Sequence, residues 1–168
     1  MIRPNKLLIL SLLLISPLLL SGCAKKINEK IAEKVVDQAS NGAVKMDING
    51  NQTTVKTEGG TGTVGENVSL PADWPKDVYV IDGKITTSYQ NAGNKGWTIS
   101  IENTKSLAEV KSAYETKLKE SGWSIKALLD MGTAVTLSAE KDQRVVSVMV
   151  SSDSEAGKTL VLVGAAEK

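Results

Sequence analysis

Histidine and phenylalanine are absent from the 168 residues, and cysteine occurs once, as Cys23. Without histidine the chain cannot form a Ser-His-Asp or Cys-His nucleophilic site, and it offers no imidazole to zinc or haem. A single cysteine also excludes a disulfide within the chain, so the fold must be stabilised by its core. We therefore expect no metal site and no cofactor.

The remaining route to hydrolysis is a pair of carboxylates, as glycosidases use. A carboxylate-dependent hydrolase is thus the enzyme alternative, and it would require two acids that converge in one pocket. We instead expect a protein that is not an enzyme, because its acids fall in expected turns and element boundaries, where solvated carboxylates are common: Asp73, Asp77, Asp82, Glu140, Asp142 and Asp153.

Neither sign of charge is in clear excess. The chain has 20 Lys and Arg against 19 Asp and Glu, a net charge of +1. Removing residues 1–22 would take away two cations, Arg3 and Lys6, and no acid, which leaves a net charge of −1. This balance lacks the basic face of a nucleic-acid-binding protein, so we expect no nucleic-acid partner.

The one long apolar run, residues 7–20, is too short to span a membrane. Its helix would reach roughly 21 Å at about 1.5 Å per residue, against a hydrocarbon core of about 30 Å. Because Arg3 and Lys6 precede it, the run instead predicts the apolar region of a secretory signal peptide.

The run ends in Leu20-Ser21-Gly22-Cys23, which resembles the lipobox of bacterial lipoprotein precursors. This resemblance implies that Leu20, Ser21 and Gly22 are read by the signal peptidase and that residues 1–22 are cleaved off. Cys23 would then be acylated with diacylglycerol and would hold the protein on membrane lipid. Ala24 follows in place of the aspartate that marks inner-membrane retention, which implies the outer membrane if the source has two membranes.

Residues 23–42 would form the lipidated N-terminus and a short amphipathic helix. Apolar residues recur every four positions from Ile27 through Ile31 and Val35 to Ala39, and Asn41-Gly42 is a stop signal. Three placements of this helix are open. It packs on its own domain, it lies on the bilayer with its lysines near anionic head groups, or it self-associates through the apolar stripe.

Residues 43–69 predict a β-hairpin followed by a glycine-rich spacer. Two alternating segments, residues 44–48 and 53–57, flank Asn49-Gly50, a type I′ turn signal. Glycines at positions 59, 60, 62 and 65 predict a loose stretch. The G-x-G-x-x-G spacing over residues 60–65 lacks the following helix that a dinucleotide site requires.

Residues 70–168 predict an α+β domain. Prolines 71 and 75 force extended backbone into an entry arm. The best helix spans residues 106–121, with a Ser106/Glu109 capping box and Gly122 at the C′ position. Strands are expected at residues 78–81, 84–90 and 97–101 before this helix, and at residues 123–129, 135–139, 145–150 and 160–163 after it.

The fold class we expect is therefore α+β, with an antiparallel β-sheet meander and one main α-helix packed on it. The element order is ββ(β)-α-ββββ, preceded by the short amphipathic helix and the hairpin. Residues 145–150 and 160–163 are apolar on both faces, which is typical of central strands.

The arm Leu70-Pro71-Ala72-Asp73-Trp74-Pro75, with residues 106–110 and Ser121-Gly122-Trp123, resembles a family of uncharacterised bacterial lipoproteins. Members share a lipobox, a helix and β spacer, and an L-P-x-D-W-P arm that opens an α+β domain. The resemblance implies this organisation and no established activity.

Together these features predict a membrane-anchored, extracytoplasmic binding or envelope-interaction module without catalysis, with another envelope protein as a possible partner. The alternative is a carrier of a lipid or small apolar ligand in a helix–sheet cleft. Four aromatic residues are candidates to line that cleft, although they would otherwise fill the core: Tyr89, Trp97, Tyr114 and Trp123.

We predict that Cys23→Ala blocks processing, because the thiol is the acyl acceptor. Mass spectrometry of the N-terminal peptide from host membranes should find an acylated Cys23 in the wild type. The variant should be lost from the processed membrane pool. An intact N-terminus with an unmodified Cys23 would contradict the prediction.

Overall fold

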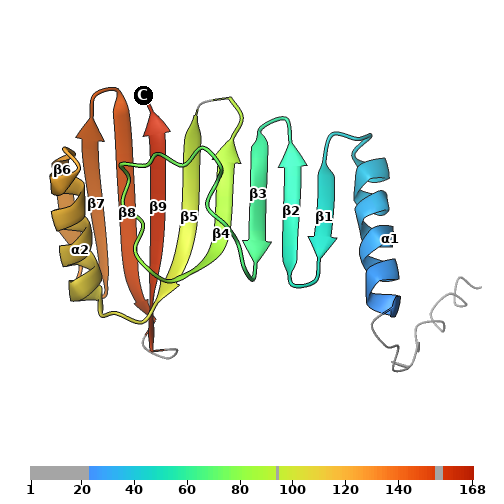
Figure 1. The fold of residues 1–168 in the computed structure, drawn as a ribbon, viewed down its shortest axis with the longest axis horizontal. Helices are drawn as coiled ribbons and strands as arrows, with labels where there is room; N and C mark the ends of the chain where they lie inside the picture. Colours follow the sequence, from blue (N-terminus) through green and yellow to red (C-terminus); the bar gives the residue numbers. More distant parts are fainter. Residues whose placement is uncertain (1–22, 94, 154–156) are drawn as a thin grey trace, which may run out of the picture.

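The computed structural model describes residues 23–93, 95–153 and 157–168, which form two helices and one nine-stranded sheet (Figure 1). The signal segment, with Leu20, Ser21 and Gly22, lies outside the described residues. Cys23 is the first residue of α1, and its side chain is not described. Within the described ranges, no helix is long and apolar enough to cross a membrane.

The helices are α1, Cys23–Ala39, and α2, Leu107–Glu120. The strands before α2 are β1 Lys45–Asn49, β2 Gln52–Thr57, β3 Gly60–Gly65, β4 Lys84–Asn91 and β5 Gly96–Asn103. Those after it are β6 Ser124–Asp130, β7 Ala134–Lys141, β8 Arg144–Asp153 and β9 Lys158–Glu167.

All the strands pair antiparallel in the order β1-β2-β3-β4-β5-β9-β8-β7-β6. The chain runs from β1 to β5, crosses through α2 to the far edge, and returns from β6 to β9, which pairs with β5. An antiparallel sheet with a helix packed on it is confirmed, although the molecule is mostly sheet. Consecutive strands are neighbours from β1 to β5 and from β6 to β9, as a meander requires. The expected meander is interrupted where β5 pairs with β9 instead of β6.

The glycine-rich spacer prediction was wrong, because Gly60–Gly65 forms β3 between β2 and β4. The glycines of β3 allow the backbone of neighbouring segments to pack closely against this strand. A Cβ at Gly60, whose φ is 148°, would overlap the Gln90 carbonyl oxygen, and one at Gly65, whose φ is 128°, would overlap that of Asn51. The glycines therefore let neighbouring backbone approach at the strand ends.

The hairpin of β1 and β2 is confirmed with a different turn. Its two-residue loop is Gly50-Asn51, since Asn49 pairs with Gln52. Gly50 has a φ of 63°, while Asn51 does not take a positive φ. A positive φ at the first loop position is typical of a type II′ turn and not of the expected type I′.

The expected strand at residues 78–81 does not form. Residues 66–83 link β3 to β4 in the chain and form an arm, which crosses one face of the sheet over β5 and β9 as far as β8 (Figure 1). Val78 and Ile81 are buried in the core, and Tyr114 bonds to the Ile81 N–H, so this segment packs on the sheet without joining its ladder. The apolar residues of this segment correctly predicted that it is buried, but they wrongly predicted that it pairs with another strand.

The arm and α2 cover the same face of the sheet. On α2, Val110, Tyr114 and Leu118 are buried against β6, β7 and β8. The Tyr114 hydroxyl accepts a hydrogen bond from the Ile81 N–H at 3.4 Å, and burial raises the pKa of Tyr114 above its usual value. This residue joins the helix to the arm.

Both ends of α2 match the sequence prediction. Ser106 and Glu109 form the capping box. At the other end Gly122 has a φ of 81°, and the Trp123 N–H donates to the Leu118 carbonyl at 2.9 Å, which completes a Schellman motif.

Asp77 of the arm binds two cations of the β7–β8 hairpin. Both Arg144 guanidinium nitrogens donate to its carboxylate at 2.7 Å, and Lys141 Nζ donates at 2.7 Å. Lys141 also donates to the Ser121 carbonyl at the end of α2, and Trp123 Nε1 donates to the Asp77 carbonyl at 2.9 Å. Hydrogen bonds from Arg144, then Lys141, hold the pKa of Asp77 well below its usual range. We call these five residues the Asp77 cluster.

The other face of the sheet is open. The central positions of β8 and β9 are confirmed, but only one face of each strand is buried. Met149 pairs with Leu162, and both side chains are exposed, as is Leu160. The apolar residues on both faces of β8 and β9 therefore correctly predicted that these strands are central in the sheet. They did not correctly predict that both faces are buried.

We predict that Asp77→Asn lowers the free energy of unfolding at pH 7 by about 2 kcal/mol, because it removes charge-assisted hydrogen bonds at a partly exposed site. A carboxyl with a lowered folded pKa stabilises the protein above its unfolded pKa, near 4, and loses that contribution as pH falls. Urea titrations should therefore show the gap between variant and wild type narrowing from pH 7 to pH 2.5. Asp142→Asn in the adjacent turn is the control, and a gap that does not change with pH would contradict the prediction.

Trp97 and Trp123 allow a matched comparison. Trp97 Nε1 is buried without a hydrogen-bond partner among the described residues, whereas Trp123 Nε1 bonds to Asp77, and Arg144 lies 5.0 Å from its ring centroid. Trp→Phe removes the same atoms at both sites. We predict that Trp123→Phe lowers the free energy of unfolding by about 1–2 kcal/mol more than Trp97→Phe, as measured by denaturation followed by circular dichroism. Equal losses would refute this account.

Candidate functional site

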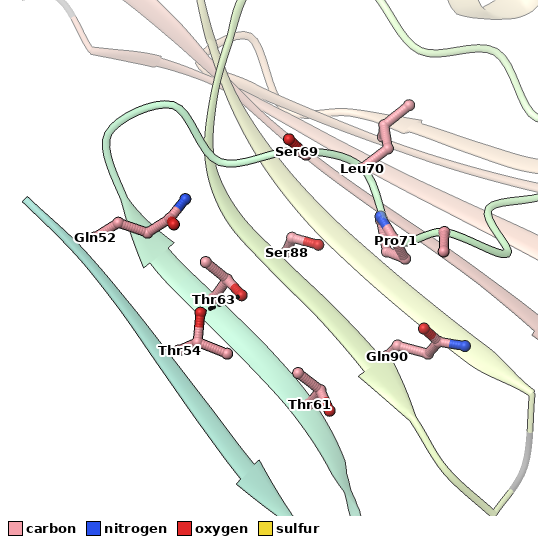
Figure 2. A pocket seen from close by; sticks show the side chains of 10 residues that line it. Gln52, Thr54, Thr61, Thr63, Ser69, Leu70, Pro71, Ser88 and Gln90 are labelled. Atoms are coloured by element: carbon pink, nitrogen blue, oxygen red, sulfur yellow. Dashed lines mark hydrogen bonds between the residues drawn. The ribbon is translucent and has the colours of Figure 1, made fainter. Parts of the chain in front are cut away.

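A polar groove of about 300 Å³ lies between the arm and strands β2 to β4 (Figure 2). It is on the same face of the sheet as α2, towards the α1 edge. Its ten lining residues carry hydroxyl, amide or aliphatic side chains: Gln52, Thr54, Thr61, Thr63, Ser69, Leu70, Pro71, Ala72, Ser88 and Gln90.

The register of three strands builds the floor of the groove. Thr54 pairs with Thr63, Thr63 with Ser88, and Thr61 with Gln90, so their side chains lie on one face. The Thr54 and Thr63 hydroxyls hydrogen-bond to each other at 3.1 Å. Where the aliphatic core under α2 ends, these strands replace it with polar side chains.

The arm forms the wall of the groove. Pro71 has a restricted φ, and Leu70 before it is held in extended backbone. Gln90 Nε2 donates to Asp73 Oδ2 at 3.1 Å, which fastens the arm to β4. Trp74 is buried and donates from Nε1 to the Val78 carbonyl at 3.2 Å.

Ser88 is the most informative lining residue. It is only 7% exposed, and its hydroxyl has no hydrogen-bond partner among the described residues. Figure 2 shows this hydroxyl directed towards the arm at Pro71. The hydroxyl opens into the groove, where it is free to bond to water or to a ligand. The hydroxyls of Thr61 and Ser69 likewise have no partner within the described chain.

The groove is also electrically neutral. None of its ten lining residues is charged, and Asp73 beside it is bonded to Gln90. Hydroxyl and amide groups both donate and accept hydrogen bonds. The arrangement can therefore hold an uncharged polar molecule, and its lining contains no carboxylate, amine or thiol to act as acid, base or nucleophile.

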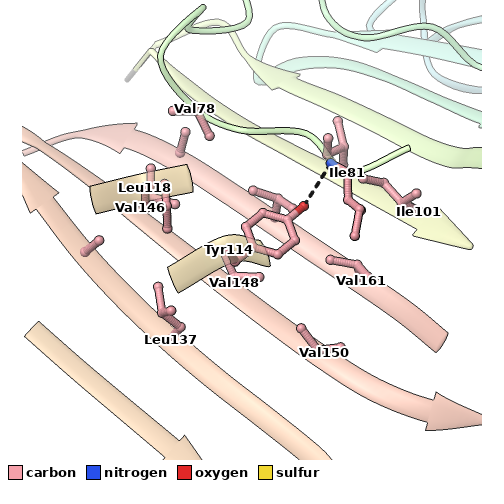
Figure 3. Packing of buried hydrophobic residues seen from close by; sticks show 14 of the residues in the cluster. Val78, Ile81, Ile101, Tyr114, Leu118, Leu137, Val146, Val148, Val150 and Val161 are labelled. Atoms are coloured by element: carbon pink, nitrogen blue, oxygen red, sulfur yellow. Dashed lines mark hydrogen bonds between the residues drawn. The ribbon is translucent and has the colours of Figure 1, made fainter. Parts of the chain in front are cut away.

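The four aromatic residues that the sequence proposed for a cleft are not brought together. Tyr114 and Trp123 are in the core, where Figure 3 shows Tyr114 among buried valines and leucines of α2 and the sheet. Trp97 is buried on the same face of β5. Tyr89 lies on the opposite, open face, where its hydroxyl donates to the Gly59 carbonyl. Tyr89 and Trp97 both line a shallow pocket of about 290 Å³ over β4, β5, β8 and β9, which Tyr114 and Trp123 do not line.

Of the carboxylates that the hydrolase alternative needs, Asp82 shares a pocket of about 440 Å³ with Glu102, and three lysines also line it: Lys84, Lys105 and Lys158. Glu102 is bound there to Lys158 at 2.7 Å, so it is held in an ion pair. Glu102, Asp130 and Glu140 each pair with a different lysine, and Asp77 pairs with Arg144 and Lys141. In the described part of the chain, no group of three or more Cys, Asp or Glu residues is placed to hold a metal ion.

Sequence reasoning missed the groove, although a signal was present. Hydroxyl and amide residues alternate along β3 at Thr61 and Thr63, and along β4 at Ser88 and Gln90. A strand face that packs under an arm normally carries aliphatic residues there, so polar residues at these positions indicate an exposed or ligand-contacting face.

A protein-family model described as START domain-like matches residues 85–157. This segment runs from β4 through α2 into the loop after β8 and covers less than half of the chain. It includes Ser88 and Gln90 and leaves out β1 to β3 and the arm. No curated protein and no solved structure gave a match.

Proposed function

We propose that this protein is a lipid-anchored, extracytoplasmic binding module that holds a small neutral ligand, such as one sugar unit of a glycan, in the groove. The observation that carries the proposal is the Ser88 hydroxyl, which has no hydrogen-bond partner among the described residues and opens into an uncharged groove. The START domain-like match supports a ligand-binding module, and β4 places two groove residues within the matched segment.

The groove chemistry supports a sugar over other small molecules. A sugar ring presents hydroxyls around its edge and C–H groups on its faces. Thr61, Ser69 and Ser88 would bond to the hydroxyls, while Leu70 and Pro71 would contact an apolar ring face. The volume is at the small end of ligand sites, which favours one or two sugar units.

Neutral lining also argues for binding without turnover. Glycoside hydrolysis requires two carboxyl groups beside the scissile bond, and the groove lining has none. An acylated Cys23 would place the groove in the cell envelope, whose polymers are built from sugars. The expected location of the protein and the chemistry of the groove then both favour a sugar as the ligand.

The test is a titration of the detergent-solubilised, acylated protein with neutral N-acetylated disaccharides. Isothermal calorimetry should show saturable binding, and Ser88→Ala should weaken it about tenfold or more, because the ligand loses a buried hydrogen-bond partner. The same variant should leave the unfolding midpoint unchanged or slightly raised, since the hydroxyl has no partner in the free protein.

Ser147→Ala, on the open face of β8, is the matched control and should bind like the wild type. Full binding by Ser88→Ala would remove the groove as the site. Absence of binding by every neutral saccharide at millimolar concentration would remove the ligand class.

A further inference from the structure

We propose that α1 lies along the surface of an anionic bilayer, with Ile31 and Val35 in the interface. This inference rests on the proposed acylation of Cys23. It adds an orientation to that function, because a helix held flat on the membrane fixes how the sheet stands above it.

The first observation is which side of α1 contacts the sheet. The Glu33 carboxylate accepts a hydrogen bond from the Ile48 N–H of edge strand β1 at 2.8 Å. Ala32 and Val36, on the same side of the helix, are partly covered. The expectation that the helix packs on its own domain is thus met by this polar contact and two small apolar side chains.

The second observation is that the apolar stripe faces away from the protein. Ile31 is 55% exposed and Val35 is 57% exposed. An amphipathic helix normally buries this stripe against its domain. Here the sheet leaves Ile31 and Val35 uncovered, so both are available to an apolar surface outside the described chain.

The third observation selects the bilayer as that surface. Cys23, the first residue of α1, stands eight positions before Ile31 and twelve before Val35. Ile31 and Val35 are four residues apart and form one exposed row, and Cys23 lies about 80° and 120° around the helix from them. An acyl chain that enters the bilayer at Cys23 would hold the start of α1 at the interface, and Val35 lies about 18 Å further along the helix.

The charge of α1 also favours an anionic bilayer as the surface that covers Ile31 and Val35. Lys34 precedes Val35 by one position and makes no ion pair within the described residues, whereas Lys30, which precedes Ile31, is bound to Glu33 at 2.7 Å. Lysines beside an interfacial row are attracted to anionic head groups. A second copy of the helix is a weaker occupant, because the exposed row spans too few turns for a stable coiled coil.

The test uses the acylated full chain in vesicles of phosphatidylcholine and phosphatidylglycerol. Because acylation consumes Cys23, Val35→Cys provides a single thiol for an environment-sensitive fluorophore. Ser112→Cys, on the exposed side of α2, is the matched control. Head-group nitroxide lipids should quench the label at position 35 at least twofold more than the label at position 112, and Ile31→Ser should reduce that difference.

Equal quenching at the two positions, in protein that floats with the vesicles, would overturn the proposal and leave the lipid anchor intact. Blue-shifted but unquenched emission at position 35 would also overturn it, because protein would then cover the row. Failure of the chain to be acylated or to float with vesicles would instead refute the proposed anchor.

Discussion

The Asp77 carboxylate joins three parts of the molecule that are far apart in sequence. Arg144 and Lys141 bring the β7–β8 hairpin to the arm, and Lys141 continues the contact to the end of α2. A partly buried carboxylate needs such cations, because desolvation otherwise favours its neutral form. The groove wall is the earlier part of the same arm. The ion pairs of Asp77 therefore help to hold the arm over the sheet.

The sequence was most informative where structure depends on neighbours in the chain. Capping by Ser106 and the Gly122 ending predicted α2 to within a residue, since each signal acts over four or five positions. Strand β3 and the arm around Val78 were mispredicted because pairing depends on partners distant in sequence. Ser88 was missed for the same reason: its burial arises only when the arm lies over β4. Lipidation at Cys23 stays a prediction.

The groove lies where two parts of the chain meet. Strand β4 belongs to the segment that matches the START domain-like family, whereas β2, β3 and the arm lie outside it. Binding sites are commonly added to a shared fold by elements that vary around it. Here β1 to β3 extend the sheet past β4, and the arm with Pro71 covers part of it. Specificity would thus depend mainly on residues outside the matched segment.

The continuity of the sheet has a mechanical consequence. Helix α1 runs alongside β1 in the plane of the strands, and eight spacings of about 4.8 Å separate β1 from β6, a width of roughly 38 Å (Figure 1). If α1 lies on a membrane, the plane of the sheet is roughly perpendicular to the membrane surface. Strand β3 would then lie roughly 20 Å from the α1 axis, while α2 reaches the outer end. In that orientation the protein would reach only the layer of the envelope next to the bilayer, and the width of the sheet would set how far it reaches.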